Sequence, residues 1–222
     1  MYNGFFAFIL SITTLVVSIA ILKVRLSTTV WKSIGLHLST LVFSIILALT
    51  YRTYIVQAYK IPSGAMNNTI LVGDHILVNK FYYWFNPLSH GDIIVFKFPN
   101  DHSKDYIKRI VAVGGDTVEI RNKIVYINGA AEMGNFAIHS DPRIYSDPEM
   151  HNKNYLRRDN LPQIKIPYRK LFVLGDNRDS SNDSRFWGMV DESDVRGKAF
   201  LIYWSWDYNA ASVRWGRIWE PL

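Results

Sequence analysis

Hydrophobic positions are distributed unevenly along the chain, in two long runs near the N-terminus and in short runs after residue 60. The first run, residues 2–22, holds 21 positions without a charge. The second run, residues 34–51, has 18 positions and one histidine. At 1.5 Å per residue, apolar helices of this length cross the hydrocarbon layer of a bilayer. The pattern therefore predicts two transmembrane helices, at about 2–22 and 34–55.

The segment between the two predicted helices, residues 23–33, carries Lys23, Arg25 and Lys32 and no acid. Basic loops stay on the cytoplasmic side of a membrane, so this loop is predicted to be cytoplasmic. A cleaved secretory signal is disfavoured for the first run, because basic residues follow it and none precedes it. Residues 58–222 are then an extracytoplasmic domain of about 165 residues, large enough for a core of its own.

After residue 60 the hydrophobic runs are short, rich in valine, isoleucine and aromatic residues, and bounded by Gly, Pro, Asn or Asp. This pattern is typical of β-strands, and no window between residues 60 and 200 has a convincing 3.6-residue period. Alternation on both sides of Arg121–Lys123 predicts a small hairpin. The domain is therefore predicted to be all-β, a sandwich or a barrel-like fold. The predicted strands lie within residues 75–85, 91–99, 105–113, 116–129 and 169–176.

Two segments depart from this pattern. Residues 133–166 are polar and contain three prolines, which predicts a long surface insert in the β domain. The C-terminal end holds Trp204, Trp206, Trp215 and Trp219. Tryptophan favours membrane interfaces, but aromatic strands also pack on protein cores, so both interpretations stay open for this end.

Composition narrows the classes of function. There is no cysteine, which excludes a disulfide framework and thiolate chemistry. The net charge of +6 comes without a basic cluster interleaved with aromatics. It therefore favours anionic lipid headgroups over nucleic acid as partners. The six histidines have no metal-ligand spacing, so no metal site and no cofactor are expected. A Ser-His-Asp triad stays open, because its members need not be close in sequence.

Three places could carry chemistry: the tight turn I-P-S-G-A-M at residues 61–66, Lys108 in an apolar-rich strand, and the polar loop 175–188. A lysine in such a strand either extends its amine to the surface or is desolvated. A desolvated amine has a lowered pKa and can act as a general base towards a nearby hydroxyl. The polar loop can also be no more than a loop capped by its own side chains.

Together these segments resemble the bacterial type I signal peptidases, membrane-bound serine endopeptidases with a Ser-Lys dyad. "IPSGAMNNTILVGD" is similar to the nucleophile box, "GDIIVFKFP" to the next strand, "YIKRIVAVGGD" to the lysine box and "GDNRDSSNDSRFWGMV" to the closing box. The resemblance implies removal of signal peptides from exported preproteins after small residues, typically Ala-x-Ala. It implies a multi-pass protein of the bacterial cytoplasmic membrane with the catalytic domain on the extracytoplasmic (periplasmic) side. Signal peptides, membrane lipids and the secretion translocon are the implied partners.

The resemblance implies that Lys108 is the general base, that residue 65 is the nucleophile, and that Ser63 and the backbone N–H of residue 65 form the oxyanion hole. The nucleophile position holds Ala65, so this chain is expected not to cleave. Ala65 is either an engineered substitution in an active enzyme or the mark of a natural non-catalytic protein that binds signal peptides. The retained lysine favours the first explanation. Asn68 replaces the usual proline, so the turn is expected to be less rigid.

Supporting roles follow from the same resemblance. Ser181 matches the serine that orients the lysine amine, and Asp183 and Arg185 match an ion pair that holds the site together. The positions that line the shallow substrate pockets of the family are Ile61, Pro62, Met66, Ile70, Val95, Tyr106 and Ile107.

Overall fold

The computed structural model describes residues 30–145 and 157–222, and the chain divides between Tyr54 and Ile55 into two units. In the first unit, helix α2 spans Val30–Tyr54 and overlaps the second predicted membrane helix. The first predicted helix, at 2–22, and most of the basic loop lie outside the described residues. Within the described part of the chain, no helix combines the length and apolarity needed to cross a membrane. Both membrane spans stay predictions.

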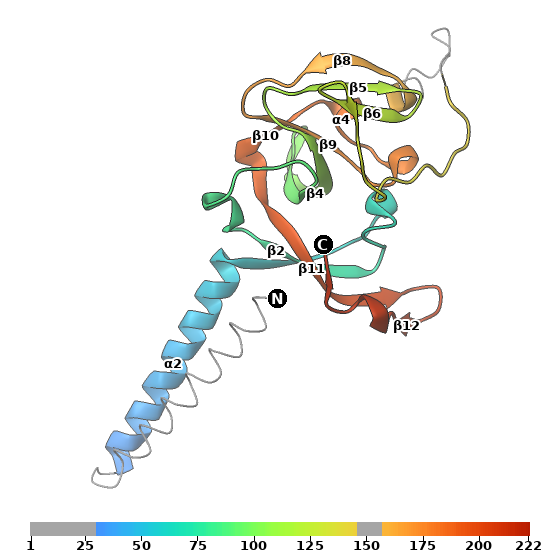
Figure 1. The fold of residues 1–222 in the computed structure, drawn as a ribbon. Coiled ribbons are helices and arrows are strands. Elements are labelled where there is room, and N and C mark those ends of the chain that lie inside the picture. The colour runs from blue at the N-terminus through green and yellow to red at the C-terminus, as the bar shows by residue number, and fades with distance from the viewer. Residues whose placement is uncertain (1–29, 146–156) are drawn as a thin grey trace. The chain divides into compact units, whose positions relative to one another are not determined.

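The second unit, Ile55–Leu222, is built on a nine-stranded antiparallel sheet (Figure 1). Seven of its strands follow one another in the order β1 (Val56–Lys60), β2 (Asp74–Asn79), β11 (Val195–Asp207), β3 (Ile93–Phe98), β4 (Asp101–Ala112), β9 (Lys170–Leu174) and β10 (Val190–Asp191). The short strands β12 (Ser212–Val213) and β13 (Glu220–Pro221) also pair with β11. The 13-residue strand β11 thus connects the C-terminal part of the unit to β2 and β3.

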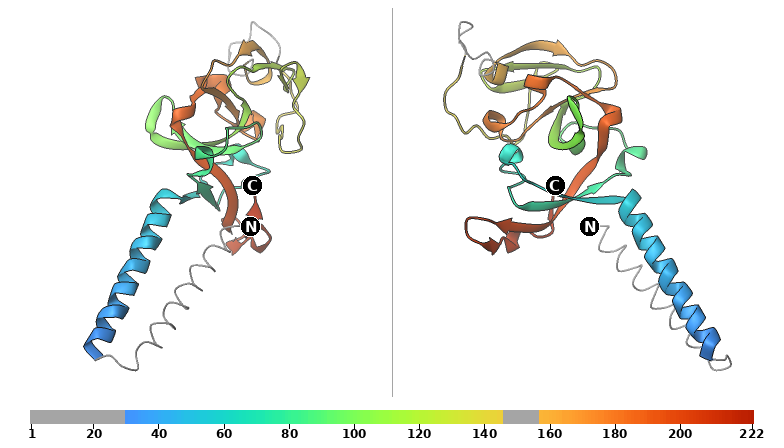
Figure 2. Two further views of the ribbon diagram at one scale, coloured as in Figure 1. Left: turned by 60° about the vertical axis from the view of Figure 1, so that its left-hand side comes forward. Right: turned by 180° about the vertical axis from the view of Figure 1, so that it is seen from behind.

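A smaller sheet lies at the end of the unit away from β12, as the views in Figure 2 also show. Its order is β7 (Ala130–Ala131), β6 (Ile124–Ile127), β5 (Thr117–Arg121) and β8 (Leu161–Lys165). The predicted hairpin is present between β5 and β6. Its two turn residues, Asn122 and Lys123, have φ of 49° and 71°, as a two-residue hairpin turn with matching twist requires.

The prediction of a surface insert at 133–166 is wrong for the C-terminal end of this segment. Strand β8 pairs with β5, and Ile164 and Ile166 pack with the core of the small sheet. Prolines and polar residues masked this strand, because only alternate positions of a one-sided strand need to be apolar. Residues 146–156, in the middle of the predicted insert, lie outside the described part.

Burial follows the two-residue period of a one-sided strand in β2, whereas β3 and β9 are buried over four successive residues. In β2 every second side chain, Asp74, Ile76 and Val78, is buried. The buried side chains form three clusters, one around β1, β2, β3 and β11, one under the small sheet, and one around β3, β4, β9 and β10. The prediction of a mainly β domain is confirmed. Helical segments in the described part of this unit are short, and the α-helix among them is α4, Ser184–Trp187.

The C-terminal tryptophans differ in exposure. The exposed fractions of Trp215 and Trp219 are 74% and 66%, so packing into the core does not account for these two side chains. Trp206 is half-buried. Contact of this end with a membrane stays a prediction.

Candidate active site

The turn after β1 presents residue 65 on a fixed backbone. The Ile61 N–H donates to Asp74 O at 2.9 Å, and the Gly73 N–H donates to Ile61 O at 3.1 Å, so the two ends of the turn are held together. Gly64–Met66 form a single 3-10 turn, and the Met66 side chain is 1% exposed. Because Met66 is fixed in the core, Ala65 lies half-buried at a defined place.

Lys108 lies in the middle of β4, opposite Ile94 of β3, and its side chain is 4% exposed. Burial lowers the pKa of Lys108 to about 8, because the charged amine loses its hydration. The carboxylate of Asp183 opposes this shift, the guanidinium of Arg185 adds to it, and the carboxylate of Asp176 opposes it. The amine of Lys108 is therefore desolvated and does not extend to the surface.

Ala65 and Lys108 lie in the wall of one cavity, here called the catalytic cavity, with a volume of about 520 Å³. It is lined by Pro62, Ser63, Gly64, Ala65, Asp105, Tyr106, Ile107, Lys108, Asn177, Ser180 and Asn182. The turn and β4 therefore bring the predicted nucleophile position, the predicted base and Ser63 together. Ser63 is exposed and extended, with φ of −132° and ψ of 154°.

The seven predicted pocket residues lie in two layers. Pro62, Tyr106 and Ile107 line the catalytic cavity. The other four are buried at 0–3% exposure in one core cluster, against which Ile107 also packs: Ile61, Met66, Ile70 and Val95. The structure thus places three residues where they can contact a ligand and four in the core that supports them.

Ser181 lies against the turn that carries residue 65. Its side chain is 5% exposed, and its Oγ has no hydrogen-bond partner among the described residues. A Cβ on Gly175 would lie 2.2 Å from Ser181 Oγ and 2.4 Å from Ala65 O. Only a glycine at 175 allows the serine and the turn to approach this closely.

Asp183 and Arg185 form a buried ion pair. Arg185 Nε and Nη2 donate to the two carboxylate oxygens of Asp183, both at 2.8 Å. Arg185 also donates to Arg158 O at 2.9 Å and to Arg178 O at 2.6 Å. Asp183 accepts from the Gly175 N–H at 3.2 Å. The pair therefore ties α4 to the strand end that contacts the turn at residue 65.

Asn177 was not predicted, yet it holds the turn directly. Its backbone N–H donates to Ala65 O, and its Nδ2 donates to Gly64 O, both at 3.1 Å. The Oδ1 of Asn177 is buried and has no hydrogen-bond partner among the described residues. The polar motif "GDNRDS" marks this region in the sequence, but it does not tell which side chain contacts the turn.

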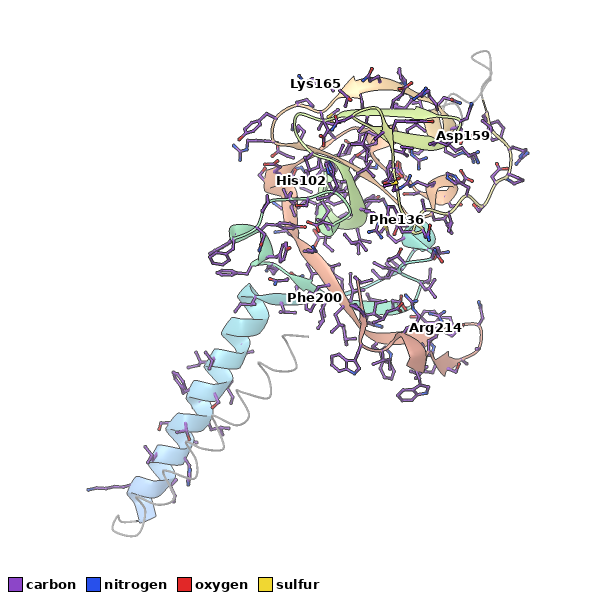
Figure 3. The ribbon with its side chains drawn as sticks, viewed as in Figure 1. His102, Phe136, Asp159, Lys165, Phe200 and Arg214 are labelled. Atoms are coloured by element: carbon purple, nitrogen blue, oxygen red, sulfur yellow. The ribbon has the colours of Figure 1, made fainter. Side chains whose placement is uncertain are left out.

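A second buried ion pair was also missed. Arg109 donates to both oxygens of Asp176, at 2.8 and 2.7 Å, and Thr69 donates to Asp176 at 2.6 Å. The guanidinium carbon of Arg109 lies 4.0 Å from the centre of the ring of Phe136, which Figure 3 labels. The pair joins β4, the turn and the closing motif next to Lys108.

This arrangement can support acyl transfer to a hydroxyl. It provides a desolvated amine as base, a turn with backbone N–H groups, and a hydroxyl at Ser63. Across residues 30–145 and 157–222, no group of three His, Asp or Glu side chains is placed to hold a metal ion.

Asn68 follows the turn with φ of 85°, a left-handed conformation that asparagine tolerates. A proline ring holds φ near −65°, so the proline of the family pattern does not fit this backbone. We expect Asn68→Pro to lower the free energy of unfolding by about 1–3 kcal/mol, and Asn68→Gly to change it by less than about 1 kcal/mol. Urea unfolding of the full chain in detergent measures both. An unchanged midpoint for the proline variant would contradict this account of the turn.

Comparisons with known proteins agree with the four motifs. Residues 34–204 match the family model described as signal peptidase, peptidase S26. The chain is 37% identical over 209 residues to signal peptidase I of Aquifex aeolicus, a match that covers 73% of this chain and 82% of that protein. It is 32% identical over 195 residues to probable signal peptidase I-1 of a Synechocystis species, covering 85% and 88%.

Among solved structures, the crystal structure of a signal peptidase I from Enterococcus faecalis is 29% identical, with a TM-score of 0.39, and covers 51% of this chain and 97% of that chain. The family model spans most of the chain and includes the turn, the lysine strand and the closing motif. The chain therefore belongs to the signal peptidase family, peptidase S26, as its motifs predicted.

Proposed function

We propose that the catalytic cavity binds the end of a signal peptide, and that with a serine at position 65 the chain is a signal peptidase I. One observation carries this proposal: the amine of Lys108, with a pKa of about 8, lies in the wall of the same cavity as residue 65. A neutral amine next to a hydroxyl is the minimum that a Ser-Lys mechanism needs. With Ala65 in place, the chain binds substrate without cutting it.

In the proposed mechanism, a serine hydroxyl at position 65 gives its proton to neutral Lys108 and attacks the scissile carbonyl carbon. Ser63 and the backbone N–H of residue 65 stabilise the oxyanion, a contact worth about 3–4 kcal/mol. The lysine then gives its proton to the leaving amine, which is the new N-terminus of the mature protein. Water, activated by the same lysine, hydrolyses the acyl-enzyme and restores the serine.

Two features keep the lysine amine in place in this proposal. The unpartnered Oγ of Ser181 is available to hydrogen-bond the lysine amine and orient it. The ion pair of Asp183 and Arg185 fixes the segment that carries Ser181. Both are positioning roles, because neither group contacts the scissile bond.

Specificity in this proposal comes from a shallow, partly apolar wall. Pro62, Tyr106 and Ile107 line the cavity from two different segments. A peptide in extended conformation is proposed to lie between these segments, with main-chain hydrogen bonds for affinity and room only for small side chains at −1 and −3. Signal peptides that end in Ala-x-Ala fit these limits.

Ala65 itself favours a second candidate, a natural protein that binds signal peptides without cutting them. Its prediction differs in one respect: a serine at 65 restores no turnover. The presence of a buried Lys108 and of the Asp183–Arg185 pair favours the first candidate, because buried charges are costly to keep without a use.

We further propose that residues 2–22 and 34–55 anchor the chain in the bacterial cytoplasmic membrane, with residues 58–222 on the extracytoplasmic side. The uncharged first run supports this. So does the exposure of apolar side chains on α2, such as Leu38, Leu41 and Phe43 at 61%, 57% and 66%. Membrane lipids and the secretion translocon are the partners that this placement implies. Release of the chain from membranes by alkaline carbonate would overturn the anchoring.

Binding by the chain as it stands tests the proposed function. We expect a fluorescent signal peptide that ends in Ala-x-Ala to bind the full chain in detergent micelles and to remain intact. A matched peptide with tyrosine at −1 is expected to bind about tenfold more weakly, because the proposed site accepts only small side chains at this position. Equal affinity for the two peptides would argue against the cavity as the binding site.

A further inference from the structure

A second cavity, here called the polar cavity, adjoins the catalytic cavity and has a volume of about 510 Å³. It is lined by Ser140, Asp141, Pro142, Arg143, Arg158, Asp179 and Ser180. Ser180 lines both cavities, so the two lie next to each other at this residue. The hydroxyl oxygens of Ser140 and Ser180 are 3.5 Å apart. No role in the proposed reaction uses this cavity.

A network of buried charges forms the floor of the polar cavity. Asp179, at 2% side-chain exposure, accepts from Lys123 Nζ at 3.0 Å and from the Asp141 N–H at 2.9 Å. Arg158 lies 3.6 Å from Asp179 and donates to Asp159 at 2.7 Å (Figure 3 labels Asp159). Opposite charges are thus matched inside the floor, which gives the cavity a fixed polar shape without a strong net charge.

The two cavities together form a surface that changes from partly apolar to polar. The catalytic cavity has an apolar side at Pro62, Tyr106 and Ile107. The segment 175–188 contributes the polar lining residues Asn177, Ser180 and Asn182, and the polar cavity adjoins the catalytic cavity at Ser180. A chain that lies across both must be small and apolar at one end and polar at the other. A preprotein has this character at its cut site, with the signal peptide before the bond and the mature chain after it.

We propose that the polar cavity binds the first residues of the mature chain, on the downstream side of the scissile bond. The serine hydroxyls at the junction and the polar rim at Asp141 offer donors and acceptors to the main chain of an extended peptide. This inference rests on the proposed function, because it assigns the apolar side of the catalytic cavity to the signal peptide. It makes the enzyme sensitive to residues that leave with the product.

The test uses the full chain with Ala65, so that bound peptides stay uncleaved. Two peptides share one signal sequence through Ala-x-Ala and end either one or six residues after the cut site. We expect the longer peptide to bind about tenfold more tightly in detergent micelles, the gain from one or two added hydrogen bonds. Ser140→Trp places an indole ring in the polar cavity. It is expected to reduce the affinity for the longer peptide to that for the shorter one, and to leave the affinity for the shorter peptide unchanged.

Two variants serve as controls. Met133→Trp adds the same ring at a side chain that is 93% exposed and outside the cavity, so the tenfold difference should persist. Ser140→Ala leaves the cavity open and should retain most of the difference in affinity between the two peptides.

Equal affinity of the unaltered chain for the two peptides would overturn the inference. A Ser140→Trp variant that weakens both peptides alike would also overturn it, because the ring would then act through the catalytic cavity. The difference in affinity between alanine and tyrosine at −1, measured with the shorter peptide, tests the proposed function separately.

Discussion

Ala65→Ser is expected to raise the rate at which this chain cleaves an Ala-x-Ala preprotein by roughly 10⁴-fold or more, from background. The substitution adds one oxygen to a side chain that is already in place beside the catalytic cavity. With a pKa of about 8, Lys108 is neutral in roughly a tenth of molecules at pH 7, a fraction roughly 300-fold higher than at its ordinary pKa. In the proposed mechanism the base is therefore available, and the nucleophile is the group that the chain lacks.

The assay is single-turnover cleavage of a purified preprotein in detergent or liposomes, with the cut site located by mass spectrometry. Ala65→Gly is the matched control, because it alters the same position without adding a nucleophile, and it should stay at background. A serine variant that binds the preprotein as tightly as this chain but leaves it uncut would identify the chain as a natural non-catalytic protein.

Lys108→Met is expected to act in opposite directions on activity and stability. In the Ala65→Ser background, it removes the base and should reduce cleavage by roughly 10⁴-fold. In either background, it replaces a buried amine by an apolar side chain of similar length. Because the pKa of Lys108 falls from 10.5 to about 8 on folding, the variant should be more stable by about 3 kcal/mol at pH 7.

The pH dependence of the free energy of unfolding tests whether burial of Lys108 destabilises the folded chain. Between pH 8 and 10.5 the unfolded chain holds the Lys108 proton and the folded chain has lost it, so the stability of the parent rises through this window. Below pH 8 both states are protonated and the contribution of this residue is constant. Urea unfolding at pH 7 and pH 10 should therefore give a difference between parent and methionine variant that shrinks at the higher pH. A constant difference would mean that Lys108 is hydrated in the folded chain.

In the Ala65→Ser background, the rate of cleavage should rise with pH through about 8, as Lys108 loses its proton.

The sequence was sufficient for the family, because four motifs occur in order along the chain. Lys108, Ser63 and Ser181 could be named as candidates because each lies inside one of these motifs. Asn177 lies inside a motif too, but its contact with Gly64 joins residues 113 positions apart. Such a contact depends on how β9 and the turn meet in the fold, which no local pattern encodes. The Arg109–Asp176 pair was missed for the same reason.

The fold was predictable at the level of its class and of most strand positions. Short runs of β-branched and aromatic residues gave β3, β4 and β9, and alternation gave the hairpin of β5 and β6. Strand β8 was missed because Pro162 and polar neighbours surround Leu161 and Ile164, the two residues of the strand that pack on the core. The order of strands in the large sheet could not be predicted, because β11 inserts between β2 and β3 from the far end of the chain.

That insertion has a consequence for how the protein matures. Ile202 in β11 pairs with Ile76 in β2, and Lys198 pairs with Ile94 in β3, so the large sheet closes only when the last third of the chain is available. Pairings this distant in sequence make folding slow, because the entropic cost of closing the long loop comes before the stabilising contacts form. During synthesis, the segment that carries residue 65 and the strand that carries Lys108 emerge long before β11 can join their sheet. A newly made chain therefore passes through a period in which the residues that line the catalytic cavity exist but the cavity itself does not.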